Sequence, residues 1–308
     1  MKKIVVIGGG FAGSYIARSF EKISSFEVTL IDSKEYFEFT PGILRTIVEP
    51  KHAEKIQICH KDYLKNAKII VGRVKEISKN EVIVGKKRIG FDYLVICSGS
   101  GYSAPIKGDE VVVATRAECL KEKYNQLCKS KRVLIVGGGL VGIELAAEIL
   151  DRYDDKEIEL VHSRDMILQR NSKKTINYAT KFLVDRGVKI SYGEKVLNKS
   201  GKDYVTNKGR KIKSDIIFLC TGIVPNYSFM KKNFGSALDD RNHVKVDNFL
   251  KVSGQENIFA AGDITSIAEE KTAQNAERHG NIVVKNIINM EKGKNLVEYK
   301  SEKKILVI

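Results

Sequence analysis

A glycine-rich turn occurs twice in this chain of 308 residues, and it limits the fold more than any other feature. The segments KIVVIGGGFAGSYIARSF (3–20) and RVLIVGGGLVGIELAAEI (132–149) align without a gap. In each, a β-type apolar run leads into G-x-G-x-x-G, and apolar residues at helical spacing follow. The sequence therefore predicts two strand–turn–helix units of the kind that binds the pyrophosphate of a dinucleotide.

Each glycine of such a turn has its own physical role. The first permits a tight bend, the second lets the backbone approach a pyrophosphate, and the third lets the helix pack closely on the strand. The free N–H groups at the start of the helix face the anion. We expect this role for Gly8, Gly10, Phe11, Ala12 and Gly13 in the first unit, and for Gly137, Gly139, Leu140, Val141 and Gly142 in the second.

A second strand follows each turn at the expected distance. FEVTLID ends at Asp32, 24 residues beyond Gly8, and EIELVHS reaches His162, 25 residues beyond Gly137. Asp32 is placed to accept a hydrogen bond from an adenosine ribose, although an aspartate there could instead cap the following loop. His162, Ser163 and Arg164 lack the carboxylate that would repel a 2′-phosphate, so the second site should tolerate NADPH unless Arg164 is simply solvated.

The duplication extends beyond the glycine turns. NEVIVGKKRIGFDYLVICSGS (80–100) and KDYVTNKGRKIKSDIIFLCTGI (202–223) share one plan. Each has a strand, a basic turn and a second strand, then Asp, a buried apolar strand, Cys, Ser or Thr, and Gly. Since repeats of this length indicate repeated structural units, we predict an α/β protein with two Rossmann-like, doubly wound domains and hence two dinucleotides.

Composition narrows the class of protein without naming a partner. No run of apolar residues is long enough to span a membrane. Five cysteines without a C-x-x-C pair are typical of a reducing cytosol, so we expect a cytoplasmic protein. The net charge of +15 fits phosphate-rich cofactors, peripheral contact with the inner face of an anionic membrane, or loose affinity for nucleic acid.

Late in the chain, NIFAAGDITS (257–266) and the helix-like KTAQNAERHGNIVVKNII complete a set of motifs. With them, the sequence resembles flavoproteins that have two dinucleotide-binding domains. Within these it is most similar to type II NADH dehydrogenases and apoptosis-inducing-factor-like NAD(P)H:quinone reductases. The motifs that carry the resemblance are GGGFAG with Asp32, EYFEFTPGILR (35–45), CSGS, GGGLVGIE, CTGI, AAGD and TAQNAERHG.

The resemblance implies a three-layer ββα domain for FAD, made of residues 1–103 and 221–291, with an NAD(P) domain inserted at 104–220. Residues 292–308 would be a C-terminal strand, the remnant of a third domain that relatives carry. For FAD it implies contacts from Lys34, Pro41, Arg45, the backbone of Val74, Ser98, Gly99, Gly262, Asp263, Ala273 and Gln274. For the nicotinamide nucleotide it implies Glu144, near the meeting point of the two rings, and Gly222.

Redox chemistry is constrained by what the sequence lacks. Disulfide reductases of this superfamily carry C-x-x-x-x-C after their second strand, whereas EYFEFTPGILRTIVEP (35–50) contains no cysteine. Cys97 and Cys220 close apolar strands, where cysteine acts as a small hydrophobe. The histidines show no spacing typical of a metal site. Electrons should therefore pass from the flavin directly to an acceptor, with Glu144 and Gln274 as the catalytic candidates.

Three functions remain open from the sequence. The first is an FAD-dependent NAD(P)H dehydrogenase that reduces a quinone. The second is a reductase of a small acidic redox protein, such as a ferredoxin or rubredoxin, which the positive charge favours. The third is a nucleotide-regulated flavoprotein that binds nucleic acid or a partner, although no nucleic-acid-binding motif supports it. The sequence also leaves open a homodimer.

Overall fold

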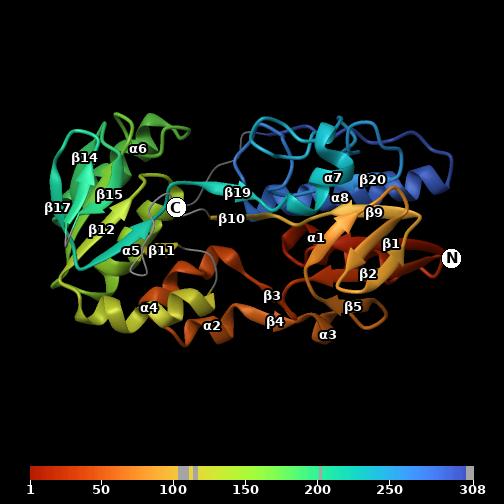
Figure 1. The fold of residues 1–308 in the computed structure, drawn as a ribbon, viewed down its shortest axis with the longest axis horizontal. Helices are drawn as coiled ribbons and strands as arrows, with labels where there is room; N and C mark the ends of the chain where they lie inside the picture. Colours follow the sequence, from red (N-terminus) through yellow and green to blue (C-terminus); the bar gives the residue numbers. More distant parts are fainter. Residues whose placement is uncertain (103–110, 114–116, 201–202, 303–308) are drawn as a thin grey trace. The chain divides into compact units, whose positions relative to one another are not determined.

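The computed structural model describes residues 1–102, 111–113, 117–200 and 203–302 (Figure 1). The described chain forms two compact units. The first contains residues 1–39, 57–101 and those after 223, and the second contains residues 40–56 and those of 102–223. Among the residues that the structure describes, no helix combines the length and apolar character needed to cross a membrane.

The first unit is built on a five-stranded parallel sheet. Side chains of its central strands, such as Ile4, Val5 and Val6, are buried whichever face they point to. This pattern is typical of a parallel sheet that is covered on both faces. The strand order is β20 (Ile258–Ala260), β9 (Tyr93–Ile96), β1 (Lys2–Ile7), β2 (Phe26–Asp32) and β5 (Lys68–Val71).

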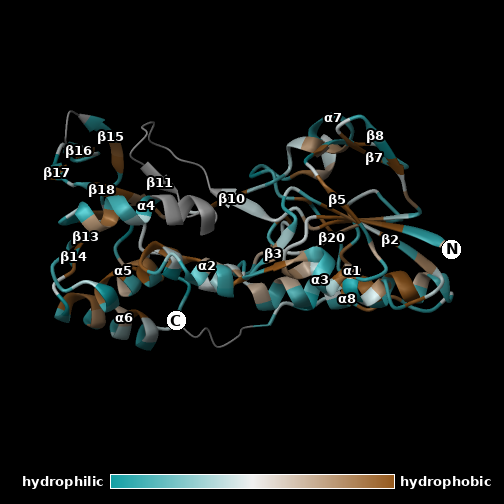
Figure 2. Ribbon diagram, turned by 90° about the horizontal axis from the view of Figure 1, so that it is seen from below, coloured by the Kyte–Doolittle hydropathy of each residue, from teal (hydrophilic) through white to brown (hydrophobic). Residues whose placement is uncertain are grey.

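Different layers cover the two faces of this sheet. Helices α1 (Phe11–Phe20) and α8 (Ala273–Glu291) pack together on one face, where Ile4 and Val6 lie in one apolar cluster with Ile16 and Val283. On the other face, Val5 lies in a second cluster with residues of an antiparallel meander. The buried strands are largely brown in Figure 2. The meander consists of β6 (Val74–Ile77), β7 (Glu81–Val84) and β8 (Lys87–Gly90).

The second unit repeats this plan. Ile135 points to the helices and Leu134 to the meander, where it lies in a cluster with Tyr204. The predicted pair of Rossmann-like domains is confirmed. The parallel sheet has the order β11 (Val111–Val113), β18 (Ile216–Leu219), β12 (Arg132–Val136), β13 (Glu157–His162) and β14 (Lys189–Tyr192). Its helices are α4 (Ala117–Lys129), α5 (Leu140–Arg152) and α6 (Lys173–Asp185), and its meander is β15 (Val196–Ser200), β16 (Asp203–Thr206) and β17 (Lys211–Lys213).

Short elements complete the described chain. Strands β3 (Tyr36–Glu38) and β4 (Gln57–Cys59) form an antiparallel pair, and β10 (Ser100–Tyr102) pairs with β19 (Ile223–Pro225). The short helices are α2 (His52–Lys55), α3 (His60–Tyr63) and α7 (Lys231–Phe234). The 3-10 turns are η1 (Thr40–Gly42), η2 (Leu44–Ile47), η3 (Ser228–Met230) and η4 (Gly235–Ala237).

Residues 40–56 differ from the predicted domain division, which placed them in the first domain. In the structure they pack within the second unit. The reason is apolar burial, because Leu44, Ile47 and Val48 join the same cluster as Ile143 of α5. The segment that would carry a dithiol in disulfide reductases therefore contributes to the core of the second unit.

The predicted C-terminal strand is wrong for the part of it that the structure describes. Residues 295–302 form no strand. Their backbone groups pair instead with side chains of α8 and with a loop, as in the bonds between Val297 and Asn286. Residues 303–308, the rest of that prediction, lie outside the described residues.

Candidate dinucleotide-binding sites

The two glycine turns have the same backbone geometry. Gly8 has φ of 98° and Gly137 has φ of 117°, a region that favours glycine. A Cβ atom on Gly8 would overlap the carbonyl group of Cys97, and one on Gly137 would overlap that of Cys220. Both turns therefore require glycine for the bend and for the close approach of a neighbouring strand.

The helix that follows each turn begins without a cap. Gly10 and Gly139 are the N-cap residues of α1 and α5, and no side chain of the described residues caps either helix. In contrast, Ser172 caps α6 and Thr272 caps α8. A Cβ on Gly10 or Gly139 would meet nothing within 4 Å, so open space lies over both helix starts. These uncapped N–H groups and the space beside them fit a pyrophosphate in each unit.

Asp32 closes β2 beside the first turn, as predicted. Its Oδ2 accepts a hydrogen bond from the N–H of Gly9 at 3.0 Å and lies 3.1 Å from Nε2 of His60. Burial acts to raise the pKa of Asp32, but the bond to His60 and the charge of Lys34 outweigh it and lower the pKa. Asp32 is therefore an ionised carboxylate that braces the glycine turn, next to where an adenosine ribose would bind.

His60 is a site residue that sequence reasoning missed. Its ring is fully buried, and Nδ1 lies 2.6 Å from the hydroxyl oxygen of Tyr63. It comes from α3, 28 residues after Asp32. No local motif marks it, because only the folded chain brings α3 under the glycine turn.

His162 occupies the matching place in the second unit. Its Nδ1 accepts a hydrogen bond from the N–H of Gly138 at 3.1 Å, as Asp32 does from Gly9. Burial and the nearby charge of Arg164 lower the pKa of His162, so the ring is neutral at pH 7 and its proton is on Nε2. Ser163 and Arg164 are exposed beyond the end of β13.

Several predicted FAD residues meet at the carboxyl edge of the first sheet. Gly262 follows β20 with φ of 82°, and a Cβ built there would lie 3.7 Å from that of Ala12 in α1. Asp263 accepts a hydrogen bond from Ser100 at 2.8 Å. The carboxyl edge of a parallel sheet is where doubly wound folds bind ligands. The glycine turn and the AAGD motif are thus side by side.

The CSGS and TAQ motifs flank this edge. Ser98 and Asn226 exchange two hydrogen bonds of 2.8 Å, and Gly99 has φ of 61°. Ala273 and Gln274 open α8, directly after its cap. Residues of this first unit would hold FAD through its phosphates, ribose and ribityl chain, and their individual contacts remain predictions.

The remaining predicted FAD residues come from other segments of the chain. Pro41 and Arg45 belong to the second unit. The Nε of Arg45 donates to Glu49 at 3.0 Å and Nη1 lies 3.7 Å from Glu148, so its described partners are carboxylates. Val74 begins β6 in the meander layer, and the ammonium group of Lys34 lies 5.6 Å from the ring centre of Tyr36.

Glu144 lies in the first turns of α5, half-buried. Burial raises its pKa, and the nearby Glu148 raises it further. A carboxylate in this position can accept a hydrogen bond from the NH₂ group of a carboxamide such as that of nicotinamide. Gly222, also predicted for this site, follows β18 with φ of 110°.

The cysteines provide no dithiol relay among the described residues. Cys59, Cys97, Cys128 and Cys220 are free. Burial raises the pKa of Cys97 and raises that of Cys220 to about 12. Both are therefore protonated thiols at pH 7, which fits their positions at the ends of apolar strands.

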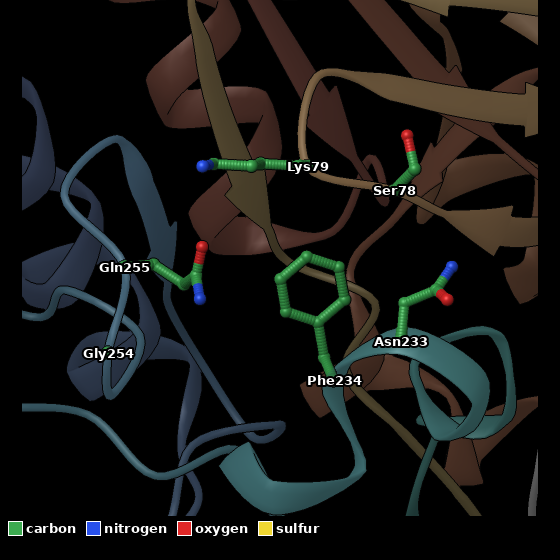
Figure 3. A pocket seen from close by; sticks show the side chains of 6 residues that line it. All are labelled: Ser78, Lys79, Asn233, Phe234, Gly254 and Gln255. Atoms are coloured by element: carbon green, nitrogen blue, oxygen red, sulfur yellow. The ribbon is translucent and has the colours of Figure 1, made fainter.

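Hollows are present in the described part of the first unit. One, of about 490 Å³, lies over the meander side and contains none of the predicted residues (Figure 3). Another, of about 520 Å³, is a groove along one face of α8. Tyr15, residues 298–300 and Glu302 form its other walls, and Gln274 lies at its N-terminal end. We call it the α8 groove.

Comparisons with known proteins agree with this geometry. Residues 2–280 match the family model described as pyridine nucleotide-disulphide oxidoreductase. The chain is 36% identical to apoptosis-inducing factor homolog A of Dictyostelium discoideum, over 96% of this chain and 78% of that protein. It is 31% identical to mouse (Mus musculus) ferroptosis suppressor protein 1, over 96% of this chain and 83% of that protein.

The fold is also that of solved structures. A water-forming NADH oxidase from Lactobacillus brevis, solved with NADH bound, superposes with a TM-score of 0.84 at 21% identity, over 97% of this chain and 71% of that chain. The family match and the two glycine turns with uncapped helices identify the cofactors as FAD and NADH or NADPH. They also identify the protein as an FAD-dependent NAD(P)H dehydrogenase. The chain belongs to the pyridine nucleotide-disulphide oxidoreductase family.

Proposed function

We propose that this dehydrogenase passes two electrons from NADH or NADPH, by way of FAD, to a quinone. Two observations carry the proposal. Both glycine turns lead into helices without a side-chain cap, and residues 35–50 contain no cysteine that could form a dithiol. Bound flavin supplies the chemistry, since it accepts a hydride and releases two electrons. The protein supplies binding, orientation and electrostatics.

Residues of the two units have separate tasks in this proposal. The N-termini of α1 and α5 bind the two pyrophosphates, and Asp32 and His162 hold the turns in shape. Glu144 orients the nicotinamide by accepting a hydrogen bond from its carboxamide NH₂ group. Holding two reacting groups in contact accounts for much of the rate of such a transfer.

The α8 groove supports a flat, partly apolar acceptor. Tyr15, Ile282 and Tyr299 give it aromatic and aliphatic walls, while Gln274 offers a hydrogen-bond donor. This mixture suits a quinone, whose ring is apolar and whose two carbonyl oxygens accept hydrogen bonds. In this proposal Gln274 orients the acceptor.

Reoxidation kinetics test the acceptor. The enzyme is first reduced with NADPH without oxygen and then mixed with a water-soluble ubiquinone analogue, or with a ferredoxin. We expect rapid reoxidation by the quinone, and slower reoxidation after Gln274→Ala. Faster reoxidation by the ferredoxin, steeply reduced by salt, would reject the quinone in favour of a small acidic redox protein.

We further propose that the second site accepts NADPH. Where the first site has Asp32, the second has neutral His162, with exposed Ser163 and Arg164 beside it. An arginine can pair bidentately with a 2′-phosphate, and a hydroxyl can add a hydrogen bond. An engineered NADPH oxidase of the same fold supports the idea, because its substitutions remove an aspartate and introduce arginine and serine.

A further inference from the structure

Residues 297–302, which we call the C-terminal strap, are bonded to the first unit along their backbone. The amide of Asn286 donates to the carbonyl of Val297 at 3.0 Å and accepts from its N–H at 2.7 Å. The N–H of Tyr299 donates to the carbonyl of Asn248 at 2.7 Å, and Arg278 donates to that of Lys300 at 3.1 Å. The strap therefore has a defined path beside α8.

The strap places two hydroxyl groups on a buried carboxylate. Tyr299 and Ser301 each donate to Oε2 of Glu269 at 2.7 Å. The side chain of Glu269 is only 5% exposed. Burial acts to raise its pKa, but His279, Ser301 and Tyr299 together lower it to about 2. Glu269 is thus a buried anion that depends on the strap for its hydrogen bonds.

His279 connects this anion to the AAGD turn. Its Nδ1 accepts a hydrogen bond from the N–H of Gly262 at 3.0 Å, so the ring proton is on Nε2. Nε2 lies 2.9 Å from Oε1 of Glu269, a short contact whose alignment is poor for a hydrogen bond. Neither atom has a hydrogen-bond partner among the described residues, so the contact between them is electrostatic.

Packing supports the same connection. The ring of Tyr299 meets that of His279 edge-on, with 4.4 Å between centres and 88° between planes. His279 is 1% exposed. An imidazole enclosed in this way keeps the orientation that its neighbours impose. The strap therefore fixes His279 both through Glu269 and by direct contact.

We propose that the C-terminal strap is part of the flavin site. Tyr299 and Ser301 hold Glu269, Glu269 orients His279, and His279 fixes the turn at Gly262 and Asp263 that holds FAD. All four side chains are positioning residues. The inference rests on FAD binding and does not depend on the electron acceptor, so failure of the quinone proposal leaves it standing.

Point variants of the full-length protein test the proposal. Flavin-free protein is titrated with FAD, and the dissociation constant is measured from flavin fluorescence. Tyr299→Phe and Ser301→Ala each remove one donor from a buried anion, and should raise the constant about five- to twenty-fold. Ser301→Thr keeps the hydroxyl and should restore binding to within about twofold of the wild type.

A matched control separates positioning from general stability. Tyr93 donates to Glu291 at 2.7 Å, at the far end of α8, so Tyr93→Phe removes a bond of the same kind. It should lower the melting temperature of the flavin-free protein about as much as Tyr299→Phe does, and leave FAD affinity unchanged. The proposal is overturned if Tyr93→Phe weakens FAD binding equally, or if neither Tyr299→Phe nor Ser301→Ala weakens it.

Discussion

At the scale of single residues, Asp32 and His162 stabilise their glycine turns in the same way, although one is a carboxylate and the other an imidazole. Each closes a second strand and accepts the N–H of the middle glycine of its turn, Gly9 or Gly138. Their positions could be predicted from the repeat. Their bonds to the turn could not, because the sequence pattern concerns the ligand and not the support of the loop.

The charge difference between these two residues leads to a prediction on nucleotide choice. Arg164→Ala should raise KM for NADPH about five- to twenty-fold and leave KM for NADH within about twofold, since only NADPH has a phosphate for the guanidinium to bind. Steady-state assays with both nucleotides measure this. Arg186→Ala is the control, because Arg186 lies over the ring of Phe182 on α6. Equal effects on the two nucleotides would show that Arg164 does not read the phosphate.

Glu144 leads to a prediction on pH. Its folded-state pKa is raised, so the stability it contributes is full below the ordinary pKa of glutamate and is lost as pH rises through the raised value. Glu144→Gln removes the ionisable group, so the variant should not lose this stability as pH rises. Its melting temperature should exceed that of the wild type at pH 8 and approach it at pH 4. A variant that melts below the wild type at pH 8 would contradict the assignment.

At the scale of elements, an uncapped start distinguishes α1 and α5 from α6 and α8 among the long helices whose starts the structure describes. Ser172 and Thr272 accept hydrogen bonds from backbone N–H groups in the first turns of α6 and α8. The N-cap residues of α1 and α5 are glycines, which have no side chain to do so. The strands and these two helices could be predicted because apolar periodicity and glycine spacing are local signals. The support from α3 and from the C-terminal strap depends on contacts between distant residues, as with His60 and Asp32.

A matched pair of variants tests the two helix starts. A methyl group on Gly10 or Gly139 meets no protein atom within 4 Å, so either alanine variant should change stability by only about 1 kcal/mol. Each methyl group should obstruct a pyrophosphate. Gly10→Ala should lower FAD content at least about tenfold, and Gly139→Ala should retain FAD and raise KM for NADPH by a similar factor. The reverse pattern would mean that the two sites are assigned to the wrong units.

At the scale of the whole molecule, the internal duplication could be predicted from the sequence, because both copies keep the same order of strands. Two parallel sheets, each with a meander on one face, follow from that repeat. The sequence does not predict which unit residues 40–56 join, because apolar side chains such as Leu44 and Ile47 could pack in the core of either unit. The path of the strap could not be predicted, since its backbone partners, such as Asn286, are side chains.

The central claim is that FAD and a nicotinamide nucleotide bind at the two separate glycine turns of one chain and exchange electrons. Anaerobic titration of the purified, FAD-loaded protein with NADPH, and separately with NADH, tests it most directly. The account predicts that at least one nucleotide bleaches the visible flavin absorption, and that Gly139→Ala retains FAD but needs about tenfold more nucleotide for the same bleaching. A protein that stays colourless after incubation with FAD, or a flavin that neither nucleotide bleaches, would contradict it.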